Sequence, residues 1–172
     1  MTARSDKVCL MVGTRKGAFV FTADRGRKNW KMTGPVLKGN DVYSMAYDKR
    51  DGSILAALSS GHWGPTIAKS KDLGKTWKVS KTPPKFPKSS GLSVSRIWQI
   101  TPGSEKQEGV VYAGIEPACL FKSEDGGDTW KANEGMLNHE TRKDWQAGGG
   151  GLCLHTILVN EKRPKRVVVA IS

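Results

Sequence analysis

The chain has 172 residues, 37% of them hydrophobic and 8% aromatic, and includes 20 glycines, a composition that excludes a disordered or fibrous protein. Its longest early apolar run, residues 8–12, is too short for a secretion signal or a membrane span, so we expect a cytoplasmic protein without a membrane partner. The net charge of +12 comes from lysines that recur beside strand-like segments without forming one cluster, and we therefore expect no nucleic-acid partner.

In chain order, the predicted elements are short strands separated by turn residues, and they fall into four groups. The first group, residues 7–34, holds "KVCLMVGT", "GAFVFTA" and "NWKMT", which is one strand short of a full set. Residues 40–82 and 93–134 each hold four strands, and residues 152–172 hold only "LCLHTILVN" and "RVVVAIS". The pattern predicts an all-β fold built from antiparallel sheets of up to four strands.

A turn motif recurs inside these groups and sets their period. Asp24, Asp72 and Asp125 occupy equivalent places in it and lie 48 and 53 residues apart. A repeat of this length, with four short strands per unit, is typical of propeller blades. We therefore predict a β-propeller of four-stranded antiparallel blades, of which about three and a half are present in residues 1–172 as one partial domain.

The motif is a strand-joining hairpin whose residues have structural roles. Its serine and aspartate can exchange hydrogen bonds with the turn backbone, its glycine takes a positive φ, and its threonine restarts the strand before a tryptophan that covers the turn. Two copies are complete, and the first is weaker, with one extra residue before its tryptophan. These structural positions are Thr22, Asp24, Gly26, Trp30, Ser70, Asp72, Gly74, Thr76, Trp77, Ser123, Asp125, Gly127, Thr129 and Trp130.

The two complete copies, "SKDLGKTW" and "SEDGGDTW", resemble the Asp-box (BNR) repeat of sialidase-like β-propellers. The phrases "SGHWGPT", "EPACLFKSEDGGDTW" and "WQAGGGGLCLH" are similar to bacterial sialidase-like BNR-repeat proteins that are grouped with the glycosyl hydrolases, and this similarity spans almost the whole chain. The resemblance implies a propeller fold. Because it also covers sialidases, other glycosidases, sortilin-type receptors and photosystem assembly factors, it leaves both an enzyme and a binding scaffold open.

The repeat also predicts that the chain is the N-terminal part of a longer protein. By the spacing of the earlier copies, a fourth motif would fall near residue ~182, beyond Ser172. A propeller closes its ring with about four to eight blades, and three and a half do not close in that way. We therefore expect missing C-terminal blades to be the partners of this chain and to complete the ring.

The candidate ligand site is predicted on the face where the second and third strands of each blade are joined, because the innermost strands converge there at the channel mouth. Aligning "YSMAYD", "WQITPG" and "HTILVN" by apolar register places Tyr43, Trp98 and His155 at equivalent positions. Such a ring can bind a carbohydrate or another small hydroxylated ligand, or it can simply pack between blades. The predicted ligand-binding residues are Arg15, Tyr43, His62, Trp63, Trp98, His139, Trp145, Gln146 and His155.

Glu116 is the candidate for catalysis, as the general acid of a glycosidase-like hydrolase whose other catalytic residues lie in the missing part. A sialidase would also need clustered arginines to hold the sugar carboxylate, usually led by an Arg-Ile-Pro stretch that this sequence lacks, and Arg15 and Arg96 are the nearby candidates. The sequence therefore favours a ligand-binding or interaction scaffold, with the hydrolase as the alternative.

Metal and cofactor sites are not predicted. Cys9, Cys119 and Cys153 lie among apolar strand residues without a Cys-x-x-Cys spacing, which is typical of buried free thiols in a reducing compartment. The four glycines at 148–151 lack the strand, turn and helix order of a phosphate-binding loop, and we interpret them as a close approach of the backbone.

Overall fold

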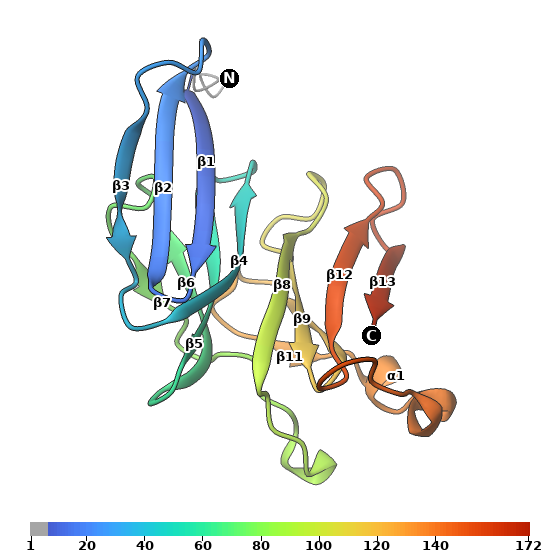
Figure 1. Ribbon diagram of the computed structural model, residues 1–172. Helices are drawn as coiled ribbons and strands as arrows, with labels where there is room; N and C mark the ends of the chain where they lie inside the picture. Colours follow the sequence, from blue (N-terminus) through green and yellow to red (C-terminus); the bar gives the residue numbers. More distant parts are fainter. Residues whose placement is uncertain (1–6) are drawn as a thin grey trace.

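In the computed structural model, which describes residues 7–172, the chain forms four antiparallel sheets (Figure 1). The first sheet has three strands, β1 (Lys7–Thr14), β2 (Gly17–Asp24) and β3 (Lys31–Val36). The second has four, β4 (Asp41–Asp48), β5 (Ser53–Ser60), β6 (Gly64–Ser70) and β7 (Lys78–Val79). The third also has four, β8 (Arg96–Pro102), β9 (Val111–Glu116), β10 (Cys119–Ser123) and β11 (Lys131–Ala132). The fourth has two, β12 (Leu154–Val159) and β13 (Val167–Ile171).

Short helical segments lie in the connections between sheets. The 3-10 segment η1 (Lys88–Ser90) joins the second and third sheets, while α1 (Glu134–Leu137) and the 3-10 segment η2 (Glu140–Asp144) join the third and fourth. Within residues 7–172, no helix has the length and apolar character needed to cross a membrane.

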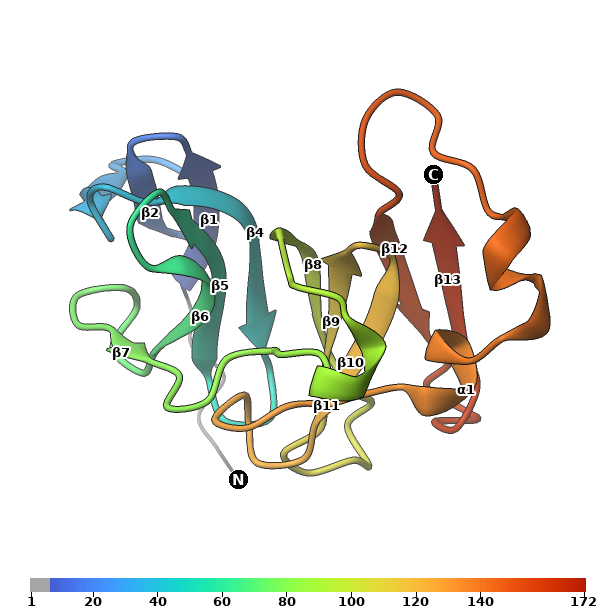
Figure 2. The ribbon, with the colours of Figure 1, turned by 90° about the horizontal axis from the view of Figure 1, so that it is seen from below.

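The four sheets follow one another as blades of an arc (Figure 2). The strands β4, β8 and β12 lie side by side on its inner side, β1 lies against β4, and β7 and β11 lie on its outer side. The predicted all-β class and the four-stranded antiparallel blades are confirmed, because the sheets hold three, four, four and two strands in chain order. The described strands do not close into a ring.

The core lies between neighbouring blades. The second and third blades each have a neighbouring blade packed against both faces of the sheet. Strands β5 and β9 therefore each contain six consecutive buried residues. Gly13 and Gly114 sit where two sheets approach closely, and a Cβ at these positions would overlap the carbonyl oxygens of Val42 and Leu154. The largest apolar cluster joins the second and third blades and includes Leu55, Ile67, Phe86, Ile97, Ile100, Ile115, Phe121 and Trp130.

Residues 70–77 and 123–130, called the repeat hairpins below, contain matching hydrogen-bond networks. In both, the serine hydroxyl donates to the aspartate, at 2.8 and 2.7 Å, and accepts from the glycine N–H, at 2.8 and 2.9 Å. The threonine donates to the same aspartate through its N–H, at 2.9 Å in both, and through its hydroxyl, at 2.6 Å in both. The tryptophan indole donates to the glycine carbonyl, at 2.9 and 3.0 Å. These bonds satisfy the turn backbone and fix the hairpin shape.

The first copy of the motif, in which Thr22 and Asp24 lie at the end of β2 and Gly26 in the turn that follows, does not form this network within the described residues. Its backbone instead takes positive φ at Arg27 and Asn29, and the Asp24 carbonyl accepts from the Arg27 N–H at 3.0 Å. Trp30 is 41% exposed. The motif copy that has one extra residue before its tryptophan therefore forms a turn of a different shape.

Replacing Asp125 with alanine is expected to lower the free energy of unfolding by about 1 kcal/mol, because the change removes hydrogen bonds from Ser123, Asp128 and Thr129 at an exposed site. Urea denaturation followed by tryptophan fluorescence measures this. Asp128→Ala is the matched control, since the Asp128 side chain makes only a 3.8 Å ion pair with Lys78 between exposed groups. Equal losses in the two variants would contradict a structural role for the network.

The repeat-hairpin aspartates also predict how stability depends on pH. Hydrogen bonds from Thr76 lower the pKa of Asp72 to about 2, and those from Thr129 outweigh burial and lower the pKa of Asp125 to about 2. Because both carboxylates are more acidic in the folded state, their stabilising contribution is complete above pH ~4 and is lost as the pH falls toward 2. Denaturation midpoints measured between pH 6 and 2 should fall more steeply for the native chain than for Asp125→Asn.

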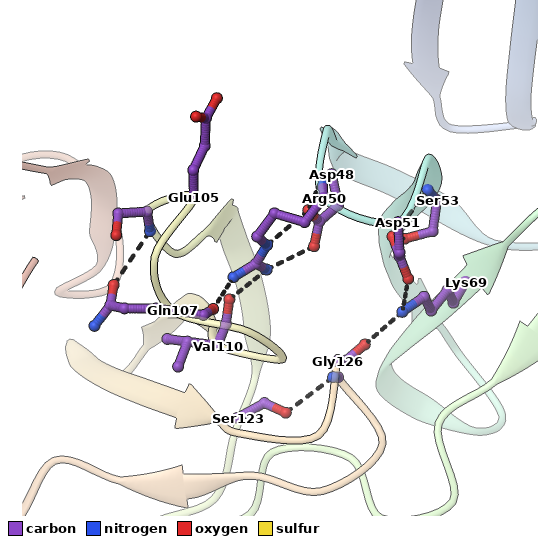
Figure 3. Close-up of polar contacts among 12 residues, drawn as sticks. Asp48, Arg50, Asp51, Ser53, Lys69, Glu105, Gln107, Val110, Ser123 and Gly126 are labelled. Carbon is purple, nitrogen blue, oxygen red and sulfur yellow. Dashed lines mark hydrogen bonds and ion pairs between the residues drawn. The ribbon is translucent and has the colours of Figure 1, made fainter. Parts of the chain in front are cut away.

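Arg50, in the turn between β4 and β5, connects the second and third blades through a largely buried ion pair (Figure 3). Its guanidinium donates to both Asp48 carboxylate oxygens, at 2.8 and 2.6 Å, and its side chain is only 13% exposed. It also donates to the carbonyl oxygens of Gln107 and Val110 in the β8–β9 connection. A single side chain thus satisfies an acid in one blade and two backbone groups in the next.

Candidate functional site

The three innermost strands share an irregularity at the same point. The pairing register shifts between Val42 and Ser44 in β4, between Ile97 and Gln99 in β8, and between Leu154 and Thr156 in β12. The residues at these shifts are Tyr43, Trp98 and His155. A β-bulge leaves its extra residue out of the ladder and turns its side chain in a new direction, and bulges are frequent next to binding sites.

These three side chains line a cavity of about 500 Å³ on the inner side of the arc. The Tyr43 and Trp98 rings are 5.4 Å apart between centroids and inclined by 57°. The volume of the cavity lies in the range of small-ligand sites, and its lining includes both aromatic and charged side chains. Its lining residues are Arg15, Tyr43, Arg96, Trp98, Glu116, Gly149, Gly150, Gly151, Cys153, His155 and Ser172.

Glu116 is a buried acidic residue of this cavity lining and is only 8% exposed. Its carboxylate accepts from the Trp98 indole N–H at 2.8 Å and from Arg96 Nη1 at 3.2 Å. Its carbonyl accepts from both the N–H and the hydroxyl of Ser95, at 2.8 and 3.0 Å. Gly151 lies so close that a Cβ there would overlap the carboxylate. Trp98 and Arg96 therefore hold the carboxylate, Gly151 packs against it, and Ser95 fixes the backbone of Glu116.

These contacts keep Glu116 ionised. Burial alone would raise the pKa of Glu116, but hydrogen bonds from Trp98 and Arg96 and the Arg96 charge outweigh it, so that its pKa lies below the usual value. The pKa of Arg96 is raised, first by Tyr43 and then by Glu116, which keeps the guanidinium charged. The site therefore presents a fixed carboxylate acceptor beside aromatic faces and a guanidinium.

Four of the predicted ligand-binding residues line the cavity together with Glu116, and these are Arg15, Tyr43, Trp98 and His155. His62 and Trp63 do not line it, because they lie in the turn between β5 and β6, where Trp63 is 88% exposed. The aromatic set predicted from sequence is thus divided between separate places on the surface.

His139 and Trp145 lie at the two ends of η2, beside a different groove of about 380 Å³ that β13 also borders. Trp145 donates to the Thr141 hydroxyl at 3.0 Å, and the Arg142 guanidinium lies 5.4 Å from its ring centroid. Gln146 follows this segment and is exposed, and it does not line the cavity.

Besides Cys153 and Ser172, two groups of cavity residues were not among the predicted ligand-binding residues, namely Arg96 and the glycines 149–151. Arg96 was named only as a possible sialidase arginine, although it lies two residues before Trp98 on the same strand and pairs in register with Glu116. Within the glycine run, only Gly151 makes the close approach that the sequence suggested, whereas Gly148, Gly149 and Gly150 have no atom within 4 Å of a built Cβ, so the prediction is wrong for these three. The alternation of side chains along a strand is the signal that could have identified Arg96.

The cysteines supply no metal ligand set. Cys119 and Cys153 are buried and Cys9 is partly exposed, and all three are free thiols. Burial raises the pKa of Cys9 and of Cys119, which keeps both thiols protonated at neutral pH. Across residues 7–172, no group of three or more histidine, cysteine or acidic side chains is arranged to hold a metal ion.

A larger hollow of about 760 Å³ lies on the outer side of the arc, between the third blade and β13. Lysine, acidic and aliphatic side chains line it, including Lys122, Glu124, Lys131 and Val167. It contains none of the predicted ligand-binding aromatics. The smaller inner cavity therefore remains the candidate site, since it combines bulged aromatic residues with a fixed ion pair.

No model of a known protein family matches this chain, and no curated protein matches its sequence. Among solved structures, it is similar to YCF48 bound to a D1 peptide, with 18% identity over 70% of this chain and 34% of that chain, at a TM-score of 0.45. It is also similar to the NanB sialidase from Streptococcus pneumoniae, in complex with 2-[(3-chlorobenzyl)ammonio]ethanesulfonate, with 16% identity over 89% of this chain and 27% of that chain, again at a TM-score of 0.45. The chain thus spans about a third or less of these proteins, and its fold rests on its own strand order and register.

Proposed function

We propose that the chain is part of an Asp-box propeller that acts as a ligand-binding module, with its ligand in the inner cavity. The observation that carries this proposal is the repeated bulge, which brings Tyr43, Trp98 and His155 into one cavity. A bulge repeated at the same point of three strands is hard to explain by strand pairing alone, because each one interrupts the ladder. The matching networks of the repeat hairpins support the Asp-box assignment.

The proposed ligand is a carbohydrate or another small hydroxylated molecule. Aromatic faces such as that of Trp98 pack against the C–H faces of a sugar, while the fixed Glu116 carboxylate accepts hydrogen bonds from its hydroxyl groups. Arg15 lines the same cavity, is exposed, and has no ion-pair partner among the described residues, so it is available to donate to the ligand. A few fixed polar groups among aromatic walls are the usual composition of a small-molecule site.

The contacts of Glu116 favour binding over hydrolysis. A general acid must carry a proton at neutral pH, which requires a raised pKa, whereas the pKa of Glu116 is lowered. The canonical hydrolysis of a glycoside also uses a second carboxylate about 5 to 9.5 Å away, which a tyrosine nucleophile can replace. Among the described residues that line the cavity, Glu116 has the only carboxylate side chain, so the second carboxylate of the canonical mechanism is not supplied by a side chain there. The hydrolase therefore remains the second candidate, one that would depend on residues outside this chain.

Titration calorimetry of the 172-residue chain with glucose, N-acetylglucosamine and glucuronate tests this function. We expect saturable binding of at least one of these sugars and no turnover of the corresponding fluorogenic glycosides. Absence of binding by all three up to about 10 mM would contradict a hydroxylated ligand. Turnover that falls about 100-fold in Glu116→Gln would instead favour the hydrolase.

A further inference from the structure

Residues 69–88, called the lysine ridge below, concentrate positive charge on one part of the fold. The segment contains seven lysines and one aspartate, so its net charge of +6 is half of the +12 carried by the whole chain. The lysines of the chain are therefore less evenly spread than their recurrence beside strands suggests. Six are exposed, and these are Lys71, Lys75, Lys78, Lys81, Lys85 and Lys88.

Most of this charge is not neutralised within the fold. Lys69 pairs with Asp51 at 2.9 Å, and Lys78 lies 3.8 Å from Asp128. The ridge's own Asp72 carboxylate is occupied by hydrogen bonds from the repeat hairpin. The lysines without an ion-pair partner among the described residues are Lys71, Lys75, Lys81, Lys85 and Lys88. Uncompensated charges of one sign create a positive potential that attracts an acidic partner.

The second half of the ridge has a fixed backbone. The Ser80 N–H donates to the Ile67 carbonyl at 2.8 Å, and the Thr82 N–H donates to the Asp128 carbonyl at 3.2 Å. Phe86 is only 4% exposed, and its ring packs against that of Phe121 in a T-shaped arrangement, with the centroids 5.2 Å apart. The neighbouring lysines therefore project from an ordered segment, which lowers the entropy lost when a partner binds.

The lysine ridge lies apart from the inner cavity. In Figure 2, the chain from β6 through β7 to η1 follows the outer side of the second and third blades. None of its lysines lines the cavity that contains Trp98 and Glu116. A partner on the ridge would therefore leave the cavity accessible.

We propose that the lysine ridge is a docking surface for an acidic protein segment rich in aspartate and glutamate. Lysine ammonium groups act as mobile point charges that pair with carboxylates, whereas nucleic-acid surfaces add arginine forks and exposed aromatic rings for stacking. The ridge has no arginine. Its aromatic residues are not free to stack, because Phe86 is buried and the half-buried Trp77 donates its indole N–H to Gly74.

Fluorescence anisotropy with a labelled 16-residue peptide of alternating Glu-Glu and Ser-Gly pairs tests this surface. We expect the 172-residue chain to bind the peptide at low salt and to bind it about tenfold more weakly at 0.2 M NaCl, because exposed ion pairs are screened. The triple variant Lys81→Glu, Lys85→Glu, Lys88→Glu should weaken binding at least tenfold. The matched control is Lys38→Glu, Lys106→Glu, Lys162→Glu, which makes the same charge change at exposed lysines elsewhere and should change affinity less than twofold.

Equal losses in the two triple variants would overturn the proposal, since the attraction would then come from net charge alone. Tighter binding of a labelled oligothymidylate with the same number of charges would also overturn it and assign the ridge to nucleic acid. If the glutamate variant does not fold, as judged by circular dichroism, Lys81→Gln, Lys85→Gln, Lys88→Gln should still weaken peptide binding several-fold, and unchanged affinity in that variant would contradict the proposal.

Discussion

Arg50→Ala is expected to lower the free energy of unfolding by about 3 to 5 kcal/mol, the largest single effect that we predict for this chain. The change leaves the Asp48 carboxylate, 5% exposed, without its guanidinium partner. It also removes a donor from the Gln107 and Val110 carbonyls of the next blade. A buried charge without its partner has a high desolvation cost, and the contact between the blades weakens as well. Chemical denaturation followed by circular dichroism measures the loss.

Lys49→Ala provides the matched control for Arg50→Ala. Lys49 is adjacent in the same turn and pairs with Glu105 at 3.4 Å, but both side chains are about 70% exposed. Such a pair contributes less than about 1 kcal/mol. If Arg50→Ala lowered the free energy of unfolding no more than Lys49→Ala does, the buried ion pair would not be what stabilises the contact between the two blades.

Trp98→Ala is expected to weaken the binding of any sugar that saturates the chain by about 1 to 3 kcal/mol, or roughly 5- to 150-fold. The substitution removes the stacking face beside Tyr43 and the indole N–H that donates to Glu116 at 2.8 Å. Trp98→Phe keeps an aromatic face and loses only the donor, so its affinity should lie between those of the native chain and Trp98→Ala. Titration calorimetry at constant pH compares the three proteins.

Trp63→Ala is the control for that series, because Trp63 is 88% exposed and does not line the inner cavity. Its affinity for the same sugar should equal that of the native chain. A larger loss in Trp63→Ala than in Trp98→Ala would move the binding site to the turn between β5 and β6.

The fold was predictable from sequence where residues close together in the chain determine the structure. The turn motif requires a serine, aspartate, glycine and threonine at fixed spacing, and this spacing revealed both the blade period and the all-β class. The equivalence of Tyr43, Trp98 and His155 followed from the alternation of apolar residues along three strands, and the structure places each at a bulge. The bulges themselves were not predicted, because a residue that leaves the ladder has no compositional mark.

Contacts between distant segments were not predictable. In the sequence, the turn that contains Arg50 looks like an ordinary hairpin turn. Two of the hydrogen-bond partners of Arg50 are backbone carbonyl oxygens 57 and 60 residues away, which a residue of any type could supply. His139 and Trp145 were assigned to the channel mouth because they lie in a long connection, but a connection without strand register does not fix where its side chains lie. The short helices α1 and η2 place them beside β13 instead.

Binding in the inner cavity can be observed in a nitrogen–proton correlation spectrum of the six tryptophan indoles, recorded while the chain is titrated with a sugar that binds. We expect the Trp98 indole resonance to shift and to saturate at the same concentration as the calorimetric signal, because this N–H donates to Glu116 inside the cavity. The Trp63 and Trp145 resonances should stay in place, since neither residue lines that cavity. A saturating shift of Trp145 or Trp63 with an unchanged Trp98 resonance would contradict binding in the inner cavity.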